Sequence, residues 1–481
     1  MCGAVFIRGD VLIKDHYDTI TAIATPAGSG AIAIIRISGP DAINIADKVF
    51  PGSQSLEEVP SHTVIYGKIK EKSDKNNNNN ILIDSVLLTV FKSPRSYTGE
   101  DTVEISCHGG MYVSHRILQM ILSQGARNAE PGEFTQRAFF NGKIDLSQAE
   151  AVADVISAKT EESLKAAQVQ LEGGLSKRIS LIRQQILDIC SLLELELDFA
   201  EEDVEFADRS EVKQRILEAI EVIEAFLSTY ERNKILKQGV RTVIVGKPNV
   251  GKSSLLNALV KEERAIVTDF PGTTRDTLEE QIDIKGIFFR VVDTAGVRTA
   301  EDAIEKKGVE RTLAQLANAD IILFLVDGSS GIDHEDRRLV ADITKYRNNA
   351  KICAAINKID LQQVVTEKQV ATILFPESII KISVKNHTGF SSLEDALIEL
   401  AVGKDFSFLD HVMVSSIRQK QALERAVCYM NQALGTLNRG LSSEYIAADL
   451  KEAIKNLGEI MGEVVTEDIL DNIFSKFCIG K

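Results

Sequence analysis

The sequence has little of several things that would place it in a special class. It contains no tryptophan, 9 prolines, 6 cysteines and 7 histidines in 481 residues. The cysteines lie at positions 2, 107, 190, 353, 428 and 478 without paired spacing, so we expect reduced thiols and no disulfide framework. The histidines form no cluster with metal-ligand spacing, which argues against a zinc or iron site.

Long apolar runs are missing as well. No window reaches the roughly 18 uninterrupted apolar residues that a membrane-spanning helix needs. The first residues, MCGAVFIRGDVLIKDHYD, mix charges into their apolar stretch and so lack the order of a signal peptide. We therefore expect a cytoplasmic protein without membrane association.

Positive charge is in deficit, with 55 Lys and Arg against 70 Asp and Glu, a formal net charge of -15. This balance argues against a protein that binds nucleic acid by covering phosphates with basic residues, although it leaves room for a local basic face. Between Ser191 and Ala225 twelve acids stand against three bases. We interpret that stretch as a solvated helical face rather than an interaction patch.

The length suggests about three domains of roughly 150 residues, and the pattern along the chain divides accordingly. After an N-terminal extension over 1–17, short apolar runs punctuated by Gly and Pro predict an α+β domain over 18–140. Apolar residues at every third or fourth position predict an all-α domain over 141–237 that resumes over 405–481. The strand-rich stretch 238–404 then forms an α/β domain inserted between the two helical segments. The stretch 70–80, with its five consecutive asparagines, is expected to be a loop between strands.

A phosphate-binding loop is predicted where the inserted domain begins. The apolar run Thr242–Val245 leads into GKPNVGKSS, and LLNALV follows at helical spacing. The spacing of Gly246 from Gly251-Lys252-Ser253, between a strand and a helix, is that of the P-loop. Backbone N–H groups would surround phosphates, Lys252 would carry charge to them, and Ser253 would offer its hydroxyl to Mg²⁺. The predicted contacts are Asn249, Val250, Gly251, Lys252, Ser253 and Ser254.

Three further motifs follow in the order that a GTPase requires. Val291–Gly296, VVDTAG, ends an apolar strand with Asp293, which can hold the Mg²⁺ shell, and continues with Thr294, Ala295 and Gly296. Asn357, Lys358 and Asp360 follow another apolar run, and a carboxylate at Asp360 can accept the two N–H donors on one edge of guanine, which adenine lacks. Ser383 suits the loop that closes over the base. GTP rather than ATP is therefore the predicted ligand.

The catalytic step is less ordinary, because Val297 follows Gly296 where Ras-like GTPases carry a glutamine that orients water. Three carboxylates just beyond, Glu301, Asp302 and Glu305, are the candidates for that role. Upstream, the stretch TDFPGTTRD provides a loop that can fold over the nucleotide, with Thr273 and Thr274 as possible Mg²⁺ ligands. Its predicted GTP contacts are Thr268, Asp269, Phe270, Pro271, Gly272, Thr273 and Thr274.

Together the motifs resemble those of the MnmE (TrmE) family of tRNA modification GTPases. The resemblance spans Asp18 to Lys481 and includes TPAGSGAIAIIRISG, YTGEDTVEISCHGG, PGEFTQRAFFNGKIDLSQAEAVADVI and the terminal FCIGK, besides the GTPase motifs. GTTRD is shared with other GTPases, whereas the front motifs and FCIGK are more specific. The extension 1–17 and the asparagine run depart from the compactness of the family without touching a motif.

For the GTPase, the resemblance implies potassium activation. The cation would be held by Asn249, Thr268, Phe270 and Thr273, and Mg²⁺ by Ser253 and Thr274. The water-positioning carboxylate of the family falls on Glu305, one of the three candidates. Lys252 and Arg275 complete the implied catalytic group, with Arg275 as a switch residue rather than an arginine finger.

For the α+β domain, the resemblance implies binding of 5,10-methylene- or 5-formyl-tetrahydrofolate by Arg36, Glu100 and Lys143, with Lys481 as a further contact. It also implies that the domain forms a homodimer. A flavin-dependent partner, MnmG, would join it in a heterotetramer that attaches an aminomethyl or carboxymethylaminomethyl group to C5 of the wobble uridine of certain tRNAs.

The terminal cysteine has three readings. A lipid anchor is disfavoured because Lys481 is not an accepted last residue for prenylation. A packed structural thiol is the ordinary role of a cysteine. The resemblance instead implies that the tail reaches the folate site and that Cys478 takes part in modification. We expect an amphipathic helix over GEVVTEDILDNIFSKF, just before this tail.

Two rival functions remain. A ribosome-assembly or checkpoint GTPase would use its nucleotide state to control docking to RNA, but such proteins usually carry a basic RNA-binding domain, whereas here the flanks are acidic helices. A folate-dependent one-carbon transferase acting alone would leave the GTPase motifs unexplained.

Overall fold

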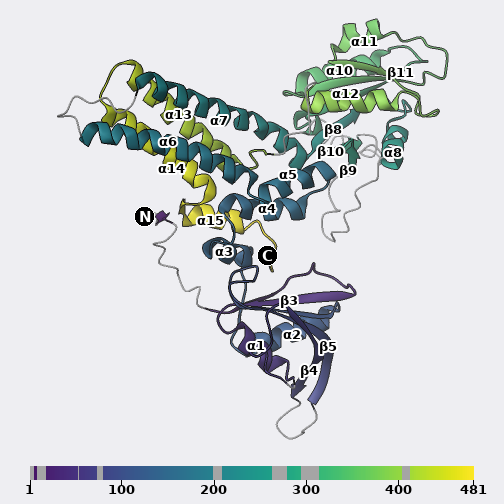
Figure 1. Ribbon diagram of the computed structural model, residues 1–481. Helices are drawn as coiled ribbons and strands as arrows, with labels where there is room; N and C mark the ends of the chain where they lie inside the picture. The colour runs from purple at the N-terminus through teal and green to yellow at the C-terminus, as the bar shows by residue number, and fades with distance from the viewer. Residues whose placement is uncertain are drawn as a thin grey trace. The chain divides into compact units, whose positions relative to one another are not determined.

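The computed structural model (Figure 1) describes residues 5–7, 18–52, 54–72, 80–198, 208–262, 279–293, 314–403 and 412–481. The chain forms two compact units. The first comprises 1–153, 170–223 and 417–481, and the second comprises 154–169 and 224–416.

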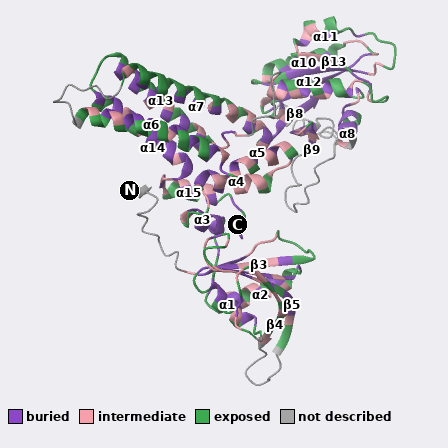
Figure 2. Ribbon diagram, in the orientation of Figure 1, coloured by how far each residue is buried: buried purple, intermediate pink, exposed green. Residues whose placement is uncertain are grey.

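The first unit contains a six-stranded sheet in the order β4-β5-β6-β3-β2-β7. The strands are β2 (Ile20–Ile23), β3 (Ile32–Ser38), β4 (Thr63–Lys72), β5 (Asn80–Phe91), β6 (Thr102–His108) and β7 (Arg127–Asn128). All pairs are antiparallel except β2 with β7. Burial alternates along the strands: in β3, Ala33, Ile35 and Ile37 are buried while Ile32 is exposed. The core therefore lies on one face, where it includes residues of α1 (Ala42–Val49) and α2 (Met111–Ser123). Figure 2 colours these elements by burial.

Helices from both ends of the chain complete the first unit. They are α3 (Glu133–Phe140), α6 (Gly174–Asp198), α13 (Ile417–Asn438), α14 (Ser443–Met461) and α15 (Glu467–Phe474). Helix α14 packs against α13, which precedes it in the chain, and against α6, which lies far from it in sequence (Figure 1). Leucine and isoleucine recur on their buried faces, for example Ile446, Leu450 and Leu457. The predicted helical domain made from two chain segments is confirmed.

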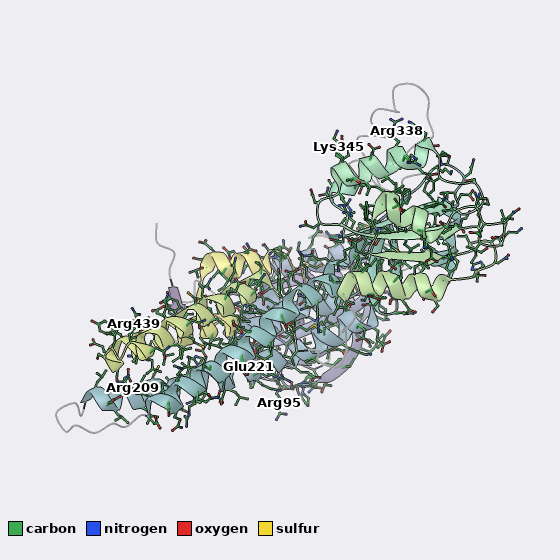
Figure 3. All side chains as sticks on the ribbon, turned by 90° about the horizontal axis from the view of Figure 1, so that it is seen from above. Arg95, Arg209, Glu221, Arg338, Lys345 and Arg439 are labelled. Atoms are coloured by element: carbon green, nitrogen blue, oxygen red, sulfur yellow. The ribbon has the colours of Figure 1, made fainter. Side chains whose placement is uncertain are left out.

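Three helices contribute residues to both units: α4 (Leu146–Ser157), α5 (Glu161–Leu171) and α7 (Arg209–Gln238). In α7 the acids Glu211, Glu218, Glu221 and Glu224 are exposed, and Glu221 projects from the helix in Figure 3. These four acids thus have the exposure expected of a solvated helical face.

Two local predictions were wrong at their boundaries. Strand β4 runs to Lys72 and β5 begins at Asn80, so the strands take up both ends of the expected loop 70–80, and 73–79 lie outside the described residues. The edge strand β4 tolerates this charged sequence because Lys70 is exposed and Glu71 pairs with Arg116. The predicted helix over 462–477 is also shorter, since Val464–Thr466 form strand β14 and the helix begins only at Glu467.

The reason for the shorter helix lies in its first residues. Gly462 ends α14 with a left-handed φ of 83°, and β-branched Val464, Val465 and Thr466 favour an extended backbone. Strand β14 pairs antiparallel with β1 (Val5–Ile7), which lies in the stretch that we treated as an N-terminal extension. The two ends of the sequence therefore meet in one small sheet.

The second unit contains a six-stranded sheet in the order β13-β12-β11-β8-β10-β9, parallel except for β9 with β10. The strands are β8 (Val240–Val245), β9 (Glu279–Ile284), β10 (Ile287–Asp293), β11 (Ile321–Asp327), β12 (Lys351–Asn357) and β13 (Ser378–Lys381). Every residue of β11, IILFLVD, is buried, as expected for a central strand covered on both faces.

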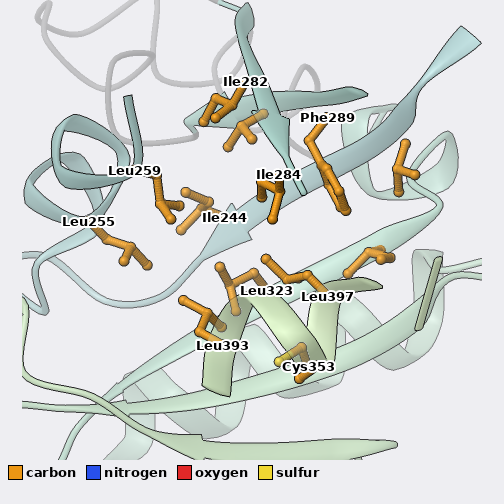
Figure 4. Packing of buried hydrophobic residues seen from close by; sticks show 14 of the residues in the cluster. Ile244, Leu255, Leu259, Ile282, Ile284, Phe289, Leu323, Cys353, Leu393 and Leu397 are labelled. Atoms are coloured by element: carbon orange, nitrogen blue, oxygen red, sulfur yellow. The ribbon is translucent and has the colours of Figure 1, made fainter. Parts of the chain in front are cut away.

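Helices cover both faces of this sheet. One core includes residues of α8 (Lys252–Glu262) and α12 (Phe390–Val402), where Leu255, Ile282, Phe289 and Leu393 meet (Figure 4). The other core includes residues of α10 (His334–Tyr346) and α11 (Glu367–Leu374). Capping boxes from Asp333 and Thr366 fix where α10 and α11 begin. The predicted α/β P-loop domain is confirmed.

Among the described residues, no helix combines the length and apolarity that crossing a membrane would require. The five cysteines that the structure describes are free thiols. No group of three or more potential metal-ligating His, Cys, Asp or Glu side chains occurs in this part of the chain.

Candidate functional site

A tight loop joins the end of β8 to the first turn of α8. Its backbone is held in conformations that few residue types adopt, with φ of 61° at Asn249 and 104° at Gly251. A Cβ atom at Gly251 would lie 2.6 Å from Nδ2 of Asn357. Only glycine therefore fits there, and the loop leads directly into the N-terminus of α8, the end of a helix that favours an anion.

Lys252 lies within this loop. Its side chain is buried, and its Nζ donates hydrogen bonds to the carbonyl oxygens of Gly246 (2.7 Å) and Lys247 (2.8 Å). The ammonium is thus held against the loop backbone, within a short movement of any anion that the loop encloses. Ser253 and Ser254 follow in the exposed first turn of α8, where Ser253 can reach a metal ion beside such an anion.

Asn357 links this loop to the predicted base-binding loop. It is buried at the end of β12, and its Nδ2 donates to the carbonyl of Val250 at 2.8 Å. Its Oδ1 accepts from the amide of Val384 at 3.1 Å. One side chain therefore fixes both loops, which couples the position of a phosphate to the position of a base.

Lys358 and Asp360 follow on the same loop. Lys358 has a left-handed φ of 65°, and its Nζ lies 2.6 Å from Oδ2 of Asp327 at the end of β11. Asp360 is exposed, and its Oδ1 accepts a hydrogen bond from Oγ of Ser383 at 2.6 Å. That bond holds the pKa of Asp360 below its usual range. Its carboxylate is therefore a charged acceptor held in place by Ser383.

A second group of predicted residues lies in the first unit. Arg36 projects from β3, where its Nε donates to Oε1 of Glu104 at 2.8 Å and its NH1 donates to the carbonyl of Gly480 at 3.3 Å. Its guanidinium stands 5.4 Å from the ring centroid of Tyr97 and 5.5 Å from that of Phe134. The C-terminal tail therefore contacts Arg36.

The backbone of the tail is held closely at this point. Gly480 has a φ of 96°, and a Cβ there would lie 2.6 Å from the carbonyl oxygen of Ile23. Cys478 is exposed, and Lys481 is half-buried. The tail is thus pinned at Gly480 while the thiol of Cys478 stays accessible.

Glu100 and Lys143 lie beside the turn at Gly99. The carboxylate of Glu100 accepts from Oγ of Ser38 at 2.7 Å and from NH1 of Arg137 at 3.3 Å. Nζ of Lys143 donates to the carbonyl of Pro94 at 3.0 Å, and its side chain lies against the Gly99 turn. Arg36, Glu100 and Lys143, from distant parts of the sequence, thus belong to one unit. Their role in folate binding stays a prediction.

Comparison with known proteins adds the family. A family profile described as "GTP-binding protein TrmE N-terminus" matches residues 19–143, and one described as "MnmE helical domain" matches residues 146–478. The chain belongs to the MnmE family. A member of this family is a GTP hydrolase that takes part in tRNA modification.

Relatives in the MnmE family align over nearly the whole chain. The tRNA modification GTPase MnmE of Carboxydothermus hydrogenoformans is 45% identical over 467 residues, covering 96% of this chain and 99% of that protein. The protein of the same name from Acetivibrio thermocellus is 43% identical over 464 residues, with the same coverage. Among solved structures, the G domain of the T. maritima FeoB iron transporter is 23% identical, with a TM-score of 0.27, over 34% of this chain and 98% of that chain.

Part of the predicted GTPase machinery lies outside the described residues. Asp293 ends β10, in register with Ile244 of β8. Two stretches of predicted residues, one before β9 and one after Asp293, lie outside the described ranges. They contain Thr268, Asp269, Phe270, Pro271, Gly272, Thr273, Thr274, Arg275, Thr294, Ala295, Gly296, Glu301, Asp302 and Glu305. Their assignments stay predictions.

Two polar contacts near the GTPase loops were missed from the sequence. Lys247, the second residue of the phosphate loop, binds Asp333 (2.8 Å) and the fully buried Asp336 (3.1 Å), which ties the loop to the start of α10. Asp327 holds Lys358. An aspartate ending the apolar run IILFLVD was a usable signal for Asp327, whereas nothing in the sequence pairs Lys247 with a helix more than eighty residues away.

Proposed function

We propose that this chain is a potassium-activated GTPase that modifies C5 of the wobble uridine of certain tRNAs, with a tetrahydrofolate as one-carbon donor and a flavin-dependent MnmG protein as partner. The observation that carries the proposal is the link from Val250 through Asn357 to Val384, in a chain that aligns with MnmE proteins over 96% of its length. Since tRNA is its substrate, we propose that it acts in the cytoplasm.

The nucleotide loops fit a bound GTP with Mg²⁺. The glycine-lined loop and Lys252 would hold the phosphates, and Ser253 with Thr274 would hold the metal. When bound, the metal neutralises charge that develops on the transferring phosphate. Asp360 would accept the two N–H donors of guanine. The proposed water-positioning residue is Glu305, with Arg275 as a switch residue.

Potassium would supply the positive charge that an arginine finger supplies in other GTPases. Asn249, which lies within the phosphate loop with a left-handed φ of 61°, is the proposed ligand among the described residues. Thr268, Phe270 and Thr273 complete the proposed site. We expect GTP hydrolysis at least about tenfold faster in KCl than in NaCl of equal ionic strength, because the smaller sodium ion would fit the ligand set poorly. Equal rates in the two salts would contradict the potassium site.

In the first unit, Arg36, Glu100, Lys143 and Lys481 would hold the folate. A pterin presents an amine and a ring N–H on one edge, and the carboxylate of Glu100 is an acceptor for both. The exposed Cys478 would take part in transfer at the tail, whose neighbour Gly480 reaches Arg36.

The open face of the sheet in this unit supports a homodimer. Tyr66 of β4 and Leu87 of β5 face each other in register, and they are 68% and 48% exposed. Val64 and Ile32 extend the same face and are exposed as well. Large apolar side chains gathered on one sheet face commonly mark an interface. We propose that a second copy of the chain covers it.

Tyr66→Asp is expected to convert the dimer into a monomer near the chain mass of 52.8 kDa, because it buries a charge in the apolar contact. Sedimentation velocity measures the mass. Tyr112→Asp is the matched control, since Tyr112 is 80% exposed on α2 and lies off this face. The proposed interface would be contradicted if the wild-type protein sedimented as a monomer, or if Tyr66→Asp and Tyr112→Asp had the same mass.

The rival function, a GTPase that docks to ribosomal RNA, predicts a different defect. Digestion of total tRNA to nucleosides from a strain that lacks this protein should show loss of the modified wobble uridine if the proposal is right. If the tRNA nucleosides were unchanged and ribosomal RNA remained immature in that strain, the GTPase that docks to ribosomal RNA would be favoured.

A further inference from the structure

A guanidinium lies buried directly behind the carboxylate of Glu100. The side chain of Arg137, on α3, is 1% exposed, and its NH1 stands 3.3 Å from each of the two carboxylate oxygens of Glu100. The same NH1 donates to the carbonyl of Asp18 at 2.8 Å. NH2 donates to Oδ1 of Asp18 (2.7 Å) and to Oε1 of Glu133 (3.0 Å).

Arg127 shares two of these acids but not the third. It binds Asp18 at 2.6 Å and Glu133 at 2.7 Å, without contacting Glu100. Burial favours the protonated forms of Asp18 and Glu133, but hydrogen bonds from Arg127 and Arg137 outweigh it and hold the pKa of each below its usual range. Asp18 and Glu133 therefore form short hydrogen bonds with both arginines, whereas the contacts between Glu100 and Arg137 are long.

Glu100 consequently keeps acceptor capacity. Its Oε2 accepts the short bond from Ser38. Within the described part of the chain, Oε1 accepts only the 3.3 Å contact from NH1 of Arg137. The carboxylate is 16% exposed. Both oxygens are thus held while the side chain stays partly exposed. A carboxylate has about four acceptor positions to fill.

The arrangement has a cost that packing alone does not explain. Nε of Arg137 is buried without a hydrogen-bond partner, and a buried donor left unpaired costs about 1–3 kcal/mol. Arg127, half-exposed, neutralises Asp18 and Glu133 without that cost. Arg137 adds a hydrogen bond to the carbonyl of Asp18 and equal contacts from NH1 to the two oxygens of Glu100. Together with the bond from Ser38, these contacts hold the Glu100 carboxylate in one orientation.

We propose that Arg137 is a positioning residue for ligand recognition: it orients the carboxylate of Glu100 to accept two adjacent N–H donors on one edge of a flat heterocycle, such as the amine and ring N–H of a pterin. This inference rests on the proposed folate function of Glu100. It assigns no contact between Arg137 and the ligand itself. The orientation would discriminate against heterocycles that offer only one donor on that edge.

Equilibrium dialysis of the full-length protein with 5-formyl-tetrahydrofolate tests the proposal. Arg137→Lys keeps the charge but loses the planar fork, so we expect at least about tenfold weaker binding, the effect of one charge-assisted hydrogen bond. Arg127→Lys is the matched control because Arg127 contacts the same two acids and not Glu100, and we expect less than threefold weakening. GTP hydrolysis should be unchanged in both.

The Glu100→Gln background separates positioning from structure. In that background Arg137→Lys should weaken folate binding by less than about a further twofold, since the carboxylate that Arg137 orients is already gone. Equal losses in the two lysine variants, or full additivity with Glu100→Gln, would overturn the positioning role. Unchanged folate binding in Glu100→Gln alone would instead overturn the proposed folate site. If the melting temperature shows that Arg137→Lys does not fold, Arg137→Gln replaces it. Glutamine is an uncharged planar donor, and the same weakening of folate binding is expected.

Discussion

Asp360→Asn is expected to weaken GTP binding by at least about 100-fold and to favour xanthosine triphosphate instead. The carboxylate of Asp360, held by Ser383 at 2.6 Å, would accept two N–H donors of guanine. Two charge-assisted hydrogen bonds at about 1.5–3 kcal/mol each correspond to at least about 100-fold in affinity. The amide of asparagine offers one acceptor and one donor, which matches xanthine, where an oxygen replaces the amine.

Titration with fluorescent analogues of the two nucleotides measures this change. Asp342→Asn on α10 removes the same charge away from the Asp360 loop and should leave both affinities unaltered. Retention of GTP affinity in Asp360→Asn would show that another residue reads the base. Equal weakening in the Asp342 control would show a general charge effect in place of recognition.

Gly480→Ala is expected to reduce tRNA modification at least tenfold while GTP hydrolysis stays within about twofold. The added Cβ would lie 2.6 Å from the carbonyl oxygen of Ile23 and 2.8 Å from Cα of Ala24, at a φ of 96° that alanine rarely adopts. Backbone strain of this kind costs about 1–3 kcal/mol, besides the clash. The tail would then lose its contact with Arg36, and Cys478, which belongs to the tail, would move away from Arg36 as well.

The readout is the fraction of modified wobble uridine in tRNA digested from a strain that carries only the variant. Gly435→Ala serves as the control, because it lies inside α13 and the one atom near its Cβ position is NH2 of Arg439 at 3.9 Å. Full modification by Gly480→Ala would mean that the tail works without its contact to Arg36.

The family to which this chain belongs could be read from short motifs, because each motif is local. A phosphate loop needs a strand, a few permissive residues and a helix in succession, and GKPNVGKSS supplies them within ten positions. Asp360 and Ser383 follow apolar strands for the same reason. The two-part helical domain was also predictable, since the apolar period returns after the strand-rich stretch.

Local pattern was less reliable where two elements compete for the same residues. The run Val464–Thr466 has helical spacing with the residues that follow, yet it forms a strand because a partner strand, β1, is present to pair with it. Charged residues at the end of β4 were taken for loop because their side chains are polar, although an edge strand needs only their backbone.

The sequence by itself determined the ligand-binding motifs, the periodicity of each element and the family. Only the tertiary structure decided which side chains meet across the first unit. Arg36 and Gly480 are 444 positions apart, and Arg137 reaches Asp18 across 119 positions and Glu100 across 37. The physical reason is that the chain dictates local backbone geometry residue by residue, whereas the pairing of buried charges depends on which surfaces the packed core brings together.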